Sequence, residues 1–297
     1  MPKEGIASKG HDAVLRYEEL QLVAETAVEI GIEKIRITGG EPLVRAGIVG
    51  FLGRLSAIPG LRHLALTTNG LMLADMAADL YKAGVQRLNV SLDSLHPQTF
   101  SDITRGGDLK KVLAGLDTAE QAGFPPPKIN CVIMRGVNDN EILDFAEMSR
   151  NRGNSIRFIE YMPAMKEDDW QRYCISGEEI LERIAGRYAL EEVDKGAFSG
   201  PSRDFRIPGA SGSIGIITAV SGHFCSECNR IRVTSTGQAK GCLFSDTKTD
   251  LIPWLRPPDP KGLAATLRGI VSGKQERHTI SAEGYTHKNF TMSQIGG

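Results

Sequence analysis

The chain has 297 residues, of which 41% are hydrophobic and 24% are charged, a composition typical of globular proteins. Its formal net charge of −1 gives no general attraction to nucleic acid or to a membrane surface, so an anion site would need a local cluster of basic residues. No apolar run is long enough to span a membrane and no signal peptide is evident, so we expect a cytoplasmic protein whose five cysteines bind metal or pack in a core.

Helical and strand patterns alternate regularly from residue 17 to residue 161. The predicted helices carry apolar residues at helical spacing, and the predicted strands are short apolar runs between them. We predict helices at Tyr17–Ile30, Ile48–Ser56, Leu71–Ala83, Asp108–Ala122 and Glu141–Asn151, and strands at Lys34–Thr38, Leu64–Thr67, Arg87–Ser91, Lys128–Met134 and Ser155–Tyr161. Because strands separated by helices pair in parallel, the fold class is predicted to be α/β, with a complete or partial β/α barrel.

The first predicted element is a helix rather than a strand. In a β/α array a strand precedes each helix that covers it, and no strand pattern occurs before Tyr17. We therefore expect an incomplete (β/α) barrel whose first strand is missing, as truncation would produce.

The regular alternation ends after Pro163, where residues 164–176 are polar and irregular. Three elements are predicted beyond them, namely helix Gly177–Arg187, strand Ile214–Val220 and helix Lys261–Ser272. We expect two regions, a partial barrel over residues 1–163 and a smaller C-terminal unit over residues 164–297 that packs on the barrel and closes it.

Four of the predicted strands end in a short polar or glycine-rich segment. Loops that follow the strands build the active sites of β/α barrels. One such segment is accounted for by a turn or a helix cap, but four at equivalent positions favour a site. The segments are TGGEP at Thr38–Pro42, TTNG at Thr67–Gly70, SLDS at Ser91–Ser94 and EYMP at Glu160–Pro163.

Three cysteines, Cys225, Cys228 and Cys242, have the spacing C-x2-C-x13-C. The first two can bind one metal centre from a tight turn, and the third can return from a hairpin whose turn contains Gly237. Three thiolates suit a zinc ion with His223 as a fourth ligand, or a four-iron cluster with one open iron. The spacing alone leaves both open.

Two arginines, Arg230 and Arg232, follow the cysteine pair and would project to the same face of a strand. A structural zinc site does not need paired guanidinium groups, whereas an anionic ligand at an open iron would, so the arginines favour an iron–sulfur site. The alternative is a solvated edge strand. Cys131 is expected in the core and Cys174 in a loop.

Basic residues alternate with apolar ones in two of the predicted strands. Lys34, Arg36 and Thr38 share one face of the first strand, and Lys128 and Asn130 share one face of another. If the apolar faces pack under the helices, the cations point into the barrel, where an unpaired charge is costly and an anion is needed. Exposure at the strand ends is the alternative. Convergent lysines and arginines would suit a triphosphate.

These motifs, with FIEYMP at Phe158–Pro163, C-x2-C-x-R-x-R-x-T-x2-G at Cys225–Gly237 and a Gly296-Gly297 end, resemble those of the GTP 3',8-cyclase family. This radical-SAM family catalyses the first step of molybdenum-cofactor biosynthesis, and the resemblance covers essentially the whole chain. It implies cyclisation of GTP to (8S)-3',8-cyclo-7,8-dihydroguanosine 5'-triphosphate. It also implies an electron donor and the downstream cyclic pyranopterin monophosphate synthase as partners, with neither nucleic acid nor membrane, and leaves a homodimer open.

The resemblance implies a role for each residue that matches a family motif. The implied contacts with S-adenosylmethionine are Gly40, Ser91 and Met162. The implied ligands of a [4Fe–4S] cluster that meets the guanine base are Cys225, Cys228 and Cys242. The implied GTP contacts are Lys34, Arg36, Thr67, Lys128, Arg230, Ile231 and Arg232. Arg36, Arg230 and Arg232 are also the predicted catalytic residues, for orientation and charge stabilisation.

One family motif is absent from the sequence, the C-x3-C-x2-C that holds the other [4Fe–4S] cluster of the full-length relatives. In relatives this motif directly precedes a segment like Met1–Gly5, so we expect a chain that begins just after it and does not generate the radical by itself. The alternatives are a non-catalytic relative that binds GTP and a cluster, another radical-SAM enzyme with an auxiliary cluster, and a zinc-stabilised α/β protein.

Overall fold

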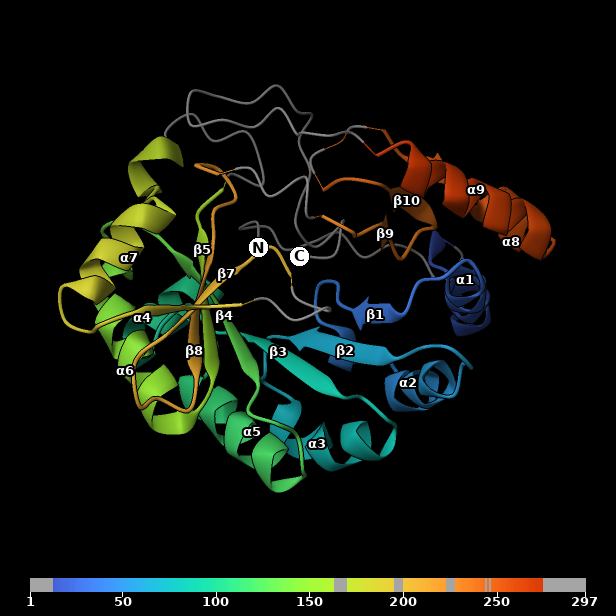
Figure 1. Ribbon diagram of the computed structural model, residues 1–297. Coiled ribbons are helices and arrows are strands. Elements are labelled where there is room, and N and C mark those ends of the chain that lie inside the picture. The colour runs from blue at the N-terminus through green and yellow to red at the C-terminus, as the bar shows by residue number, and fades with distance from the viewer. Residues whose placement is uncertain are drawn as a thin grey trace.

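The computed structural model describes residues 13–162, 170–194, 200–222, 228–243, 245 and 247–274. Most of these residues belong to one open sheet of eight strands, in the order β1-β2-β3-β4-β5-β8-β7-β6. The sheet curves, and the helices from α2 to α7 lie along its outer side (Figure 1). The radical-SAM type of partial barrel predicted from the sequence is therefore confirmed as an α/β sheet that does not close.

The strands β1 to β5 and β8 pair in parallel, while β6 and β7 are antiparallel. The strands of the large sheet are β1 (Lys34–Ile37), β2 (His63–Thr68), β3 (Arg87–Ser91), β4 (Lys128–Ile133), β5 (Ser155–Glu160), β6 (Glu191–Val193), β7 (Arg203–Arg206) and β8 (Ser213–Ile217). The helices are α1 (Tyr17–Glu29), α2 (Ile48–Ser56), α3 (Leu73–Lys82), α4 (Pro97–Thr104), α5 (Leu109–Gln121), α6 (Ile142–Arg152), α7 (Gly177–Ala185), α8 (Ile252–Leu255) and α9 (Pro260–Ser272).

The predicted elements are found within a few residues of their expected bounds. Gly31 has φ 102° and ends α1, as expected for a glycine at a helix terminus. Sequence patterns did not reveal α4, β6 or β7, which are short. The strand expected at Ile214–Val220 is β8, and it pairs directly with β5. The large sheet therefore continues past residue 163, where a boundary between two regions was expected.

The outer face of the sheet forms the main hydrophobic core. Alternate strand residues point under the helices, and they are fully or almost fully buried. Examples are Leu66, Leu88, Val90, Ile129, Ile156 and Phe158. Cys131 belongs to this set, is 0% exposed and has a pKa raised well above its usual range by burial, so its predicted core position is confirmed.

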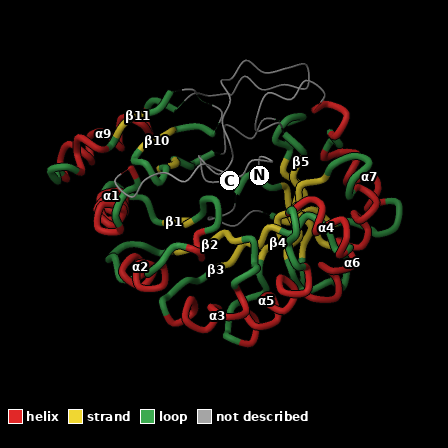
Figure 2. The backbone as a smooth tube through the Cα atoms, turned by 180° about the vertical axis from the view of Figure 1, so that it is seen from behind, coloured by secondary structure: helices red, strands yellow, loops and turns green. Residues whose placement is uncertain are grey.

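A second, smaller core joins α1 to the C-terminal part of the chain. It contains Leu15, Val23, Ala27, Ala239, Leu251, Leu255, Leu263 and Leu267. Here α9 packs against α1, and a three-stranded sheet of β9 (Arg232–Val233), β10 (Gln238–Lys240) and β11 (Thr249–Asp250) lies beside them. Figures 1 and 2 show this group near β1, at one edge of the large sheet. In the part of the chain described, no helix is long and apolar enough to cross a membrane.

Candidate functional site

The strand register decides which side chains share the inner, concave face of the sheet. Paired residues of neighbouring parallel strands lie on the same face. Starting from β1, the register links Arg36 to Ala65, Ala65 to Arg87, Asn89 to Lys128 and Asn130 to Arg157. The basic residues that the sequence predicted to face inward therefore do so, because the alternating apolar residues occupy the core.

Two lysines on this face have unusually low pKa values. Burial, and then the positive charges of Arg36, Arg157 and Arg230, lower the pKa of Lys34 to about 8. The pKa of Lys128 is also lowered to about 8, by burial and by Arg157, while Asp204 opposes the shift. The part of each shift that comes from neighbouring arginines means that these cations lie close enough to repel one another.

The arginines of the inner face show the same crowding. Arg36 is exposed on the concave face of β1, yet nearby protein atoms desolvate it and lower its pKa to about 10, helped by Arg157, Arg230 and Arg232. Arg157 on β5 is 7% exposed, and its pKa is lowered chiefly by burial. We call Lys34, Arg36, Lys128, Arg157, Arg230 and Arg232 the basic cluster.

The small sheet contributes two members of this cluster. Arg232 lies on β9, and burial with Arg230 lowers its pKa to about 10. Arg230 precedes the strand and is half-buried. Ile231 lies between the two arginines and is half-buried as well. The charge of Arg230 acts on Arg232, but only Arg232 lies within the strand, so their predicted common strand face stays a prediction.

Asp204 on β7 supplies a negative charge at the far side of the cluster, opposite in register to Gly215. Gly215 is in turn paired with Arg157, so the three residues form a row across β7, β8 and β5. A Cβ atom on Gly215 would lie 2.8 Å from Asp204 Oδ1 and 3.2 Å from Arg157 Cγ. The missing side chain of Gly215 therefore lets Arg157 and Asp204 approach each other, and Asp204 opposes the lowering of the Arg157 pKa.

The cysteine segment is partly described. Cys228 and Cys242 are free and half-buried, on the two arms of the β9–β10 hairpin, and both affect the pKa of Arg232. Gly237, with φ 82°, lies in the hairpin turn as predicted. Cys225 lies outside the described residues, as do His223 and the Gly296-Gly297 end.

The two described thiols fit a metal that prefers thiolate ligands. Burial raises the pKa of Cys228, but the backbone N–H and guanidinium of Arg230 and the charge of Lys274 outweigh it, so the net pKa is lowered. A lowered pKa favours the thiolate, which is the form that binds iron or zinc. Neither thiol pairs in a disulfide. The contacts of Cys228 do not distinguish between iron and zinc.

The residues predicted to contact S-adenosylmethionine lie at the carboxyl ends of their strands, where barrel enzymes place their sites. Gly40 follows β1 and is exposed, Ser91 ends β3 and is exposed, and Met162 follows β5 and is half-buried. Thr67, a predicted GTP contact, lies on the inner face of β2 and pairs with Asn89. These positions are consistent with one site at this end of the sheet.

Glu41 holds the first of these strand-end loops. Its carboxylate accepts hydrogen bonds from Thr68 Oγ1 at 2.8 Å, the Asn69 backbone N–H at 2.6 Å and the Leu43 backbone N–H at 3.0 Å. The TGGEP and TTNG segments are therefore tied together, which fixes the backbone next to Gly40.

Asn138 and Glu141 hold the SLDS segment in the same way. Asn138 is fully buried, and its amide donates to the carbonyl of Asp93 at 2.6 Å and to that of Val132 at 2.9 Å. Glu141 accepts from Ser94 Oγ at 2.6 Å. Asp93 itself accepts from the Val132 N–H at 2.8 Å, yet burial raises its pKa to about 6.

Glu160 fixes the loop after β5. Its carboxylate is 2% exposed and accepts hydrogen bonds from the backbone N–H groups of Gly177 at 2.7 Å, Val220 at 2.8 Å and Ser221 at 2.9 Å, and from the Ser221 hydroxyl. One side chain thus joins β5, the start of α7 and the loop that leads towards the cysteine segment.

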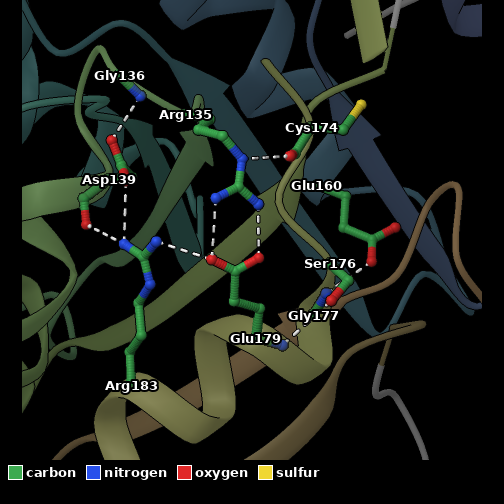
Figure 3. A network of polar contacts seen from close by, with 9 residues as sticks. All are labelled: Arg135, Gly136, Asp139, Glu160, Cys174, Ser176, Gly177, Glu179 and Arg183. Atoms are coloured by element: carbon green, nitrogen blue, oxygen red, sulfur yellow. Dashed lines mark hydrogen bonds and ion pairs between the residues drawn. The ribbon is translucent and has the colours of Figure 1, made fainter. Parts of the chain in front are cut away.

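An ion-pair network continues this rim (Figure 3). Arg135, after β4, donates two hydrogen bonds to Glu179 on α7, at 3.2 and 2.6 Å, and one to the Cys174 carbonyl at 3.3 Å. Arg183 lies between Glu179 and Asp139, at 2.7 and 3.0 Å. These groups are partly exposed, so each pair contributes modestly to stability, but together they set the position of α7.

Comparison with known proteins agrees with this architecture. Residues 4–149 match the Radical SAM superfamily, and residues 154–280 match Molybdenum Cofactor Synthesis C. A GTP 3',8-cyclase of Geobacter sulfurreducens is 61% identical over 297 residues, which is 100% of this chain and 91% of the relative. The chain belongs to the GTP 3',8-cyclase family. A second member, from Moorella thermoacetica, is 44% identical over 298 residues, again 100% of this chain and 92% of the relative.

Two solved structures share the fold of this chain at low sequence identity. SuiB of Streptococcus suis bound to S-adenosylmethionine has a TM-score of 0.57 at 13% identity, covering 84% of this chain and 61% of that one. Native anSMEcpe with bound AdoMet and a peptide has a TM-score of 0.52 at 14% identity, covering 78% of this chain and 68% of that one. The radical-SAM superfamily implies S-adenosylmethionine and a four-iron cluster as cofactors.

The sequence missed several residues that shape the site. Arg157 was overlooked, although it alternates with the apolar Ile156 and Phe158 as the predicted cations do with their neighbours. Asp204 lies on a strand that was not predicted. Glu160 belongs to a recognised motif, but only the folded chain shows the groups that it binds.

Proposed function

We propose that the basic cluster binds the triphosphate of GTP and that this chain serves the radical-SAM cyclisation of GTP to (8S)-3',8-cyclo-7,8-dihydroguanosine 5'-triphosphate, the first step of molybdenum-cofactor biosynthesis. The observation that carries the proposal is the convergence of lysines and arginines from the inner face of the large sheet and from the β9 segment. The pKa values of Lys34, Arg36, Lys128, Arg157 and Arg232 are lowered there. Repelling cations gain most from a ligand with several negative charges.

The roles of individual residues follow from their positions. Lys34, Lys128 and Arg157 stand on the large sheet and would bind phosphate oxygens. Arg36, Arg230 and Arg232 are close in space and would orient the substrate and stabilise charge. Thr67 and Ile231 are the remaining proposed GTP contacts.

S-adenosylmethionine is proposed to bind at the strand ends, through Gly40, Ser91 and Met162. Glu41, Asn138, Glu141 and Glu160 hold these loops in place through the hydrogen bonds described above. A site that is fixed before the ligand arrives loses less entropy on binding.

Cys225, Cys228 and Cys242 are proposed to hold a [4Fe–4S] cluster. When bound, such a cluster offers an open coordination position to the guanine base. The residues of this chain would then hold the base end and the phosphate end of GTP at once. We further propose that residues 1–163 form the partial barrel and residues 164–297 the region that holds this cluster. The proposed location is cytoplasmic. The proposed partners are an electron donor and the downstream cyclic pyranopterin monophosphate synthase.

Equilibrium GTP binding to the anaerobically reconstituted protein tests the proposal. Arg36→Ala and Arg157→Ala should each weaken binding about 10- to 100-fold, since a hydrogen bond to a charged group contributes about 1.5–3 kcal/mol. Arg62→Ala is the matched control, because Arg62 is exposed and pairs with Glu33. Equal affinities of all three variants and the wild type would contradict the proposed site.

A further inference from the structure

Lys274, which follows α9, contacts both arms of the β9–β10 hairpin. Its Nζ donates to the carbonyl of Arg230 at 2.7 Å and to that of Gly241 at 3.2 Å, and it lies 3.7 Å from Cys228 Sγ. Gly241 is the residue immediately before Cys242. We propose that Lys274 is a positioning residue of the cysteine site, which fixes the two arms relative to each other and donates to the sulfur of Cys228.

The chemistry of the ammonium group suits this role. Lysine has three N–H donors and no acceptor, and the structure gives it three acceptors, two carbonyl oxygens and one sulfur. Cys228 and Cys242 both lie beyond the strands of the hairpin, where the ladder of backbone hydrogen bonds no longer fixes them. The lysine therefore replaces the missing ladder at the point where the metal ligands are needed.

Lys274 is itself held in place by its surroundings. Leu263 and Leu267 of α9 are fully buried against α1, so the helix that carries the lysine is anchored. A Cβ atom on Gly241 would lie 3.3 Å from Lys274 Cγ, so the aliphatic part of the lysine packs on this glycine. The ammonium is thus positioned before any metal binds, as a supporting group must be.

Two consequences follow for a bound cluster, and both rest on the proposed function. Hydrogen bonds to ligating sulfur withdraw electron density and raise the reduction potential of an iron–sulfur cluster. Groups that orient metal ligands also raise metal affinity, and their loss commonly costs about 10- to 100-fold. Loss of Lys274 should therefore lower the potential of the cluster and speed the release of its iron.

The test uses the full chain, reconstituted anaerobically with iron and sulfide. Lys274→Met keeps the length and apolar stem of the side chain and removes the donors. Lys274→Arg keeps a cationic donor and should retain part of the effect. Lys261→Met is the matched control, because Lys261 lies on α9, the helix that Lys274 follows, and is exposed.

The readouts are iron and sulfide per chain, the rate of iron loss to a chelator, and the midpoint potential from a titration followed by electron paramagnetic resonance. We expect Lys274→Met to release iron about tenfold faster than Lys261→Met and to have a lower potential, while the circular dichroism spectra of the two variants before reconstitution are the same. If Lys274→Met matches Lys261→Met in release rate and potential while both hold a cluster, the role of Lys274 is wrong and the proposed cluster stands. If the wild type binds zinc but no iron or sulfide, both proposals are wrong.

Discussion

Replacing Glu160 by glutamine tests the role of the carboxylate that fixes the strand-end loop after β5. In Glu160→Gln one oxygen becomes an NH2 group, which faces backbone N–H donors whichever way the amide is turned. In the wild type, one carboxylate oxygen accepts from the Gly177 N–H and the Ser221 hydroxyl, and the other accepts from the N–H groups of Val220 and Ser221. With the NH2 turned towards Gly177, the Ser221 hydroxyl can reverse and accept from it, so the substitution removes at least the Gly177 hydrogen bond, leaves that N–H unpaired in a buried site and makes the acceptor of the other bonds neutral.

A hydrogen bond to a charged group contributes about 1.5–3 kcal/mol, and the neutral acceptor weakens the bonds that remain, so the expected loss is about 3 kcal/mol in the free energy of unfolding. That is a large share of the roughly 5–15 kcal/mol that stabilises a typical domain. Urea unfolding of the metal-free protein measures the loss, with Glu178→Gln as the control because Glu178 is exposed in the first turn of α7. The control should change by less than about 0.5 kcal/mol. A Glu160→Gln protein as stable as the control would refute the reasoning.

Two further predictions concern the inner face of the sheet. Because the pKa values of Lys34 and Lys128 are lowered to about 8 and bound phosphate favours the charged amines, raising the pH from about 7 to 9 should weaken GTP binding about tenfold per lysine. Equilibrium dialysis across this range checks the sign, Lys34→Met should flatten the profile, and a flat wild-type profile would contradict the assignment. Gly215→Ala should lower the free energy of unfolding by about 1–3 kcal/mol and weaken GTP binding, because the new Cβ would clash with Ser202 Oγ and would also crowd Asp204 and Arg157. Gly53→Ala in α2 is the control, because nothing lies within 4 Å of an added Cβ, and it should be neutral or stabilising. Equal stability and equal GTP affinity of the two alanine variants would contradict the prediction.

The sequence was informative wherever local patterns determine the structure. Alternation placed Lys34 and Arg36 opposite two isoleucines, and the folded strand has that arrangement because burial of the isoleucines under α-helices leaves the cations no other face. The hairpin turn at Gly237 and the end of α1 at Gly31 were equally local, since both glycines adopt positive φ.

Contacts between distant segments could not be read from the sequence. Asp204 reaches the basic cluster only because β7 pairs antiparallel with β8, and the polar, glycine-rich stretch that contains β7 gave no strand signal. Lys274 meets Gly241 because α9 packs on α1, and Glu160 meets Val220 across 60 positions of the chain. Arg157 is different, because alternation with Ile156 and Phe158 was visible in the sequence and could have identified it.

The most direct test of the central claim compares nucleotides that differ in phosphate number. The reconstituted protein would be titrated with GTP, GDP, GMP and guanosine at two salt concentrations, with ATP as the control for the base. If the basic cluster binds the triphosphate, affinity should fall stepwise along this series, and the difference between GTP and guanosine should shrink at high salt. Equal affinity for GTP and guanosine would contradict the account.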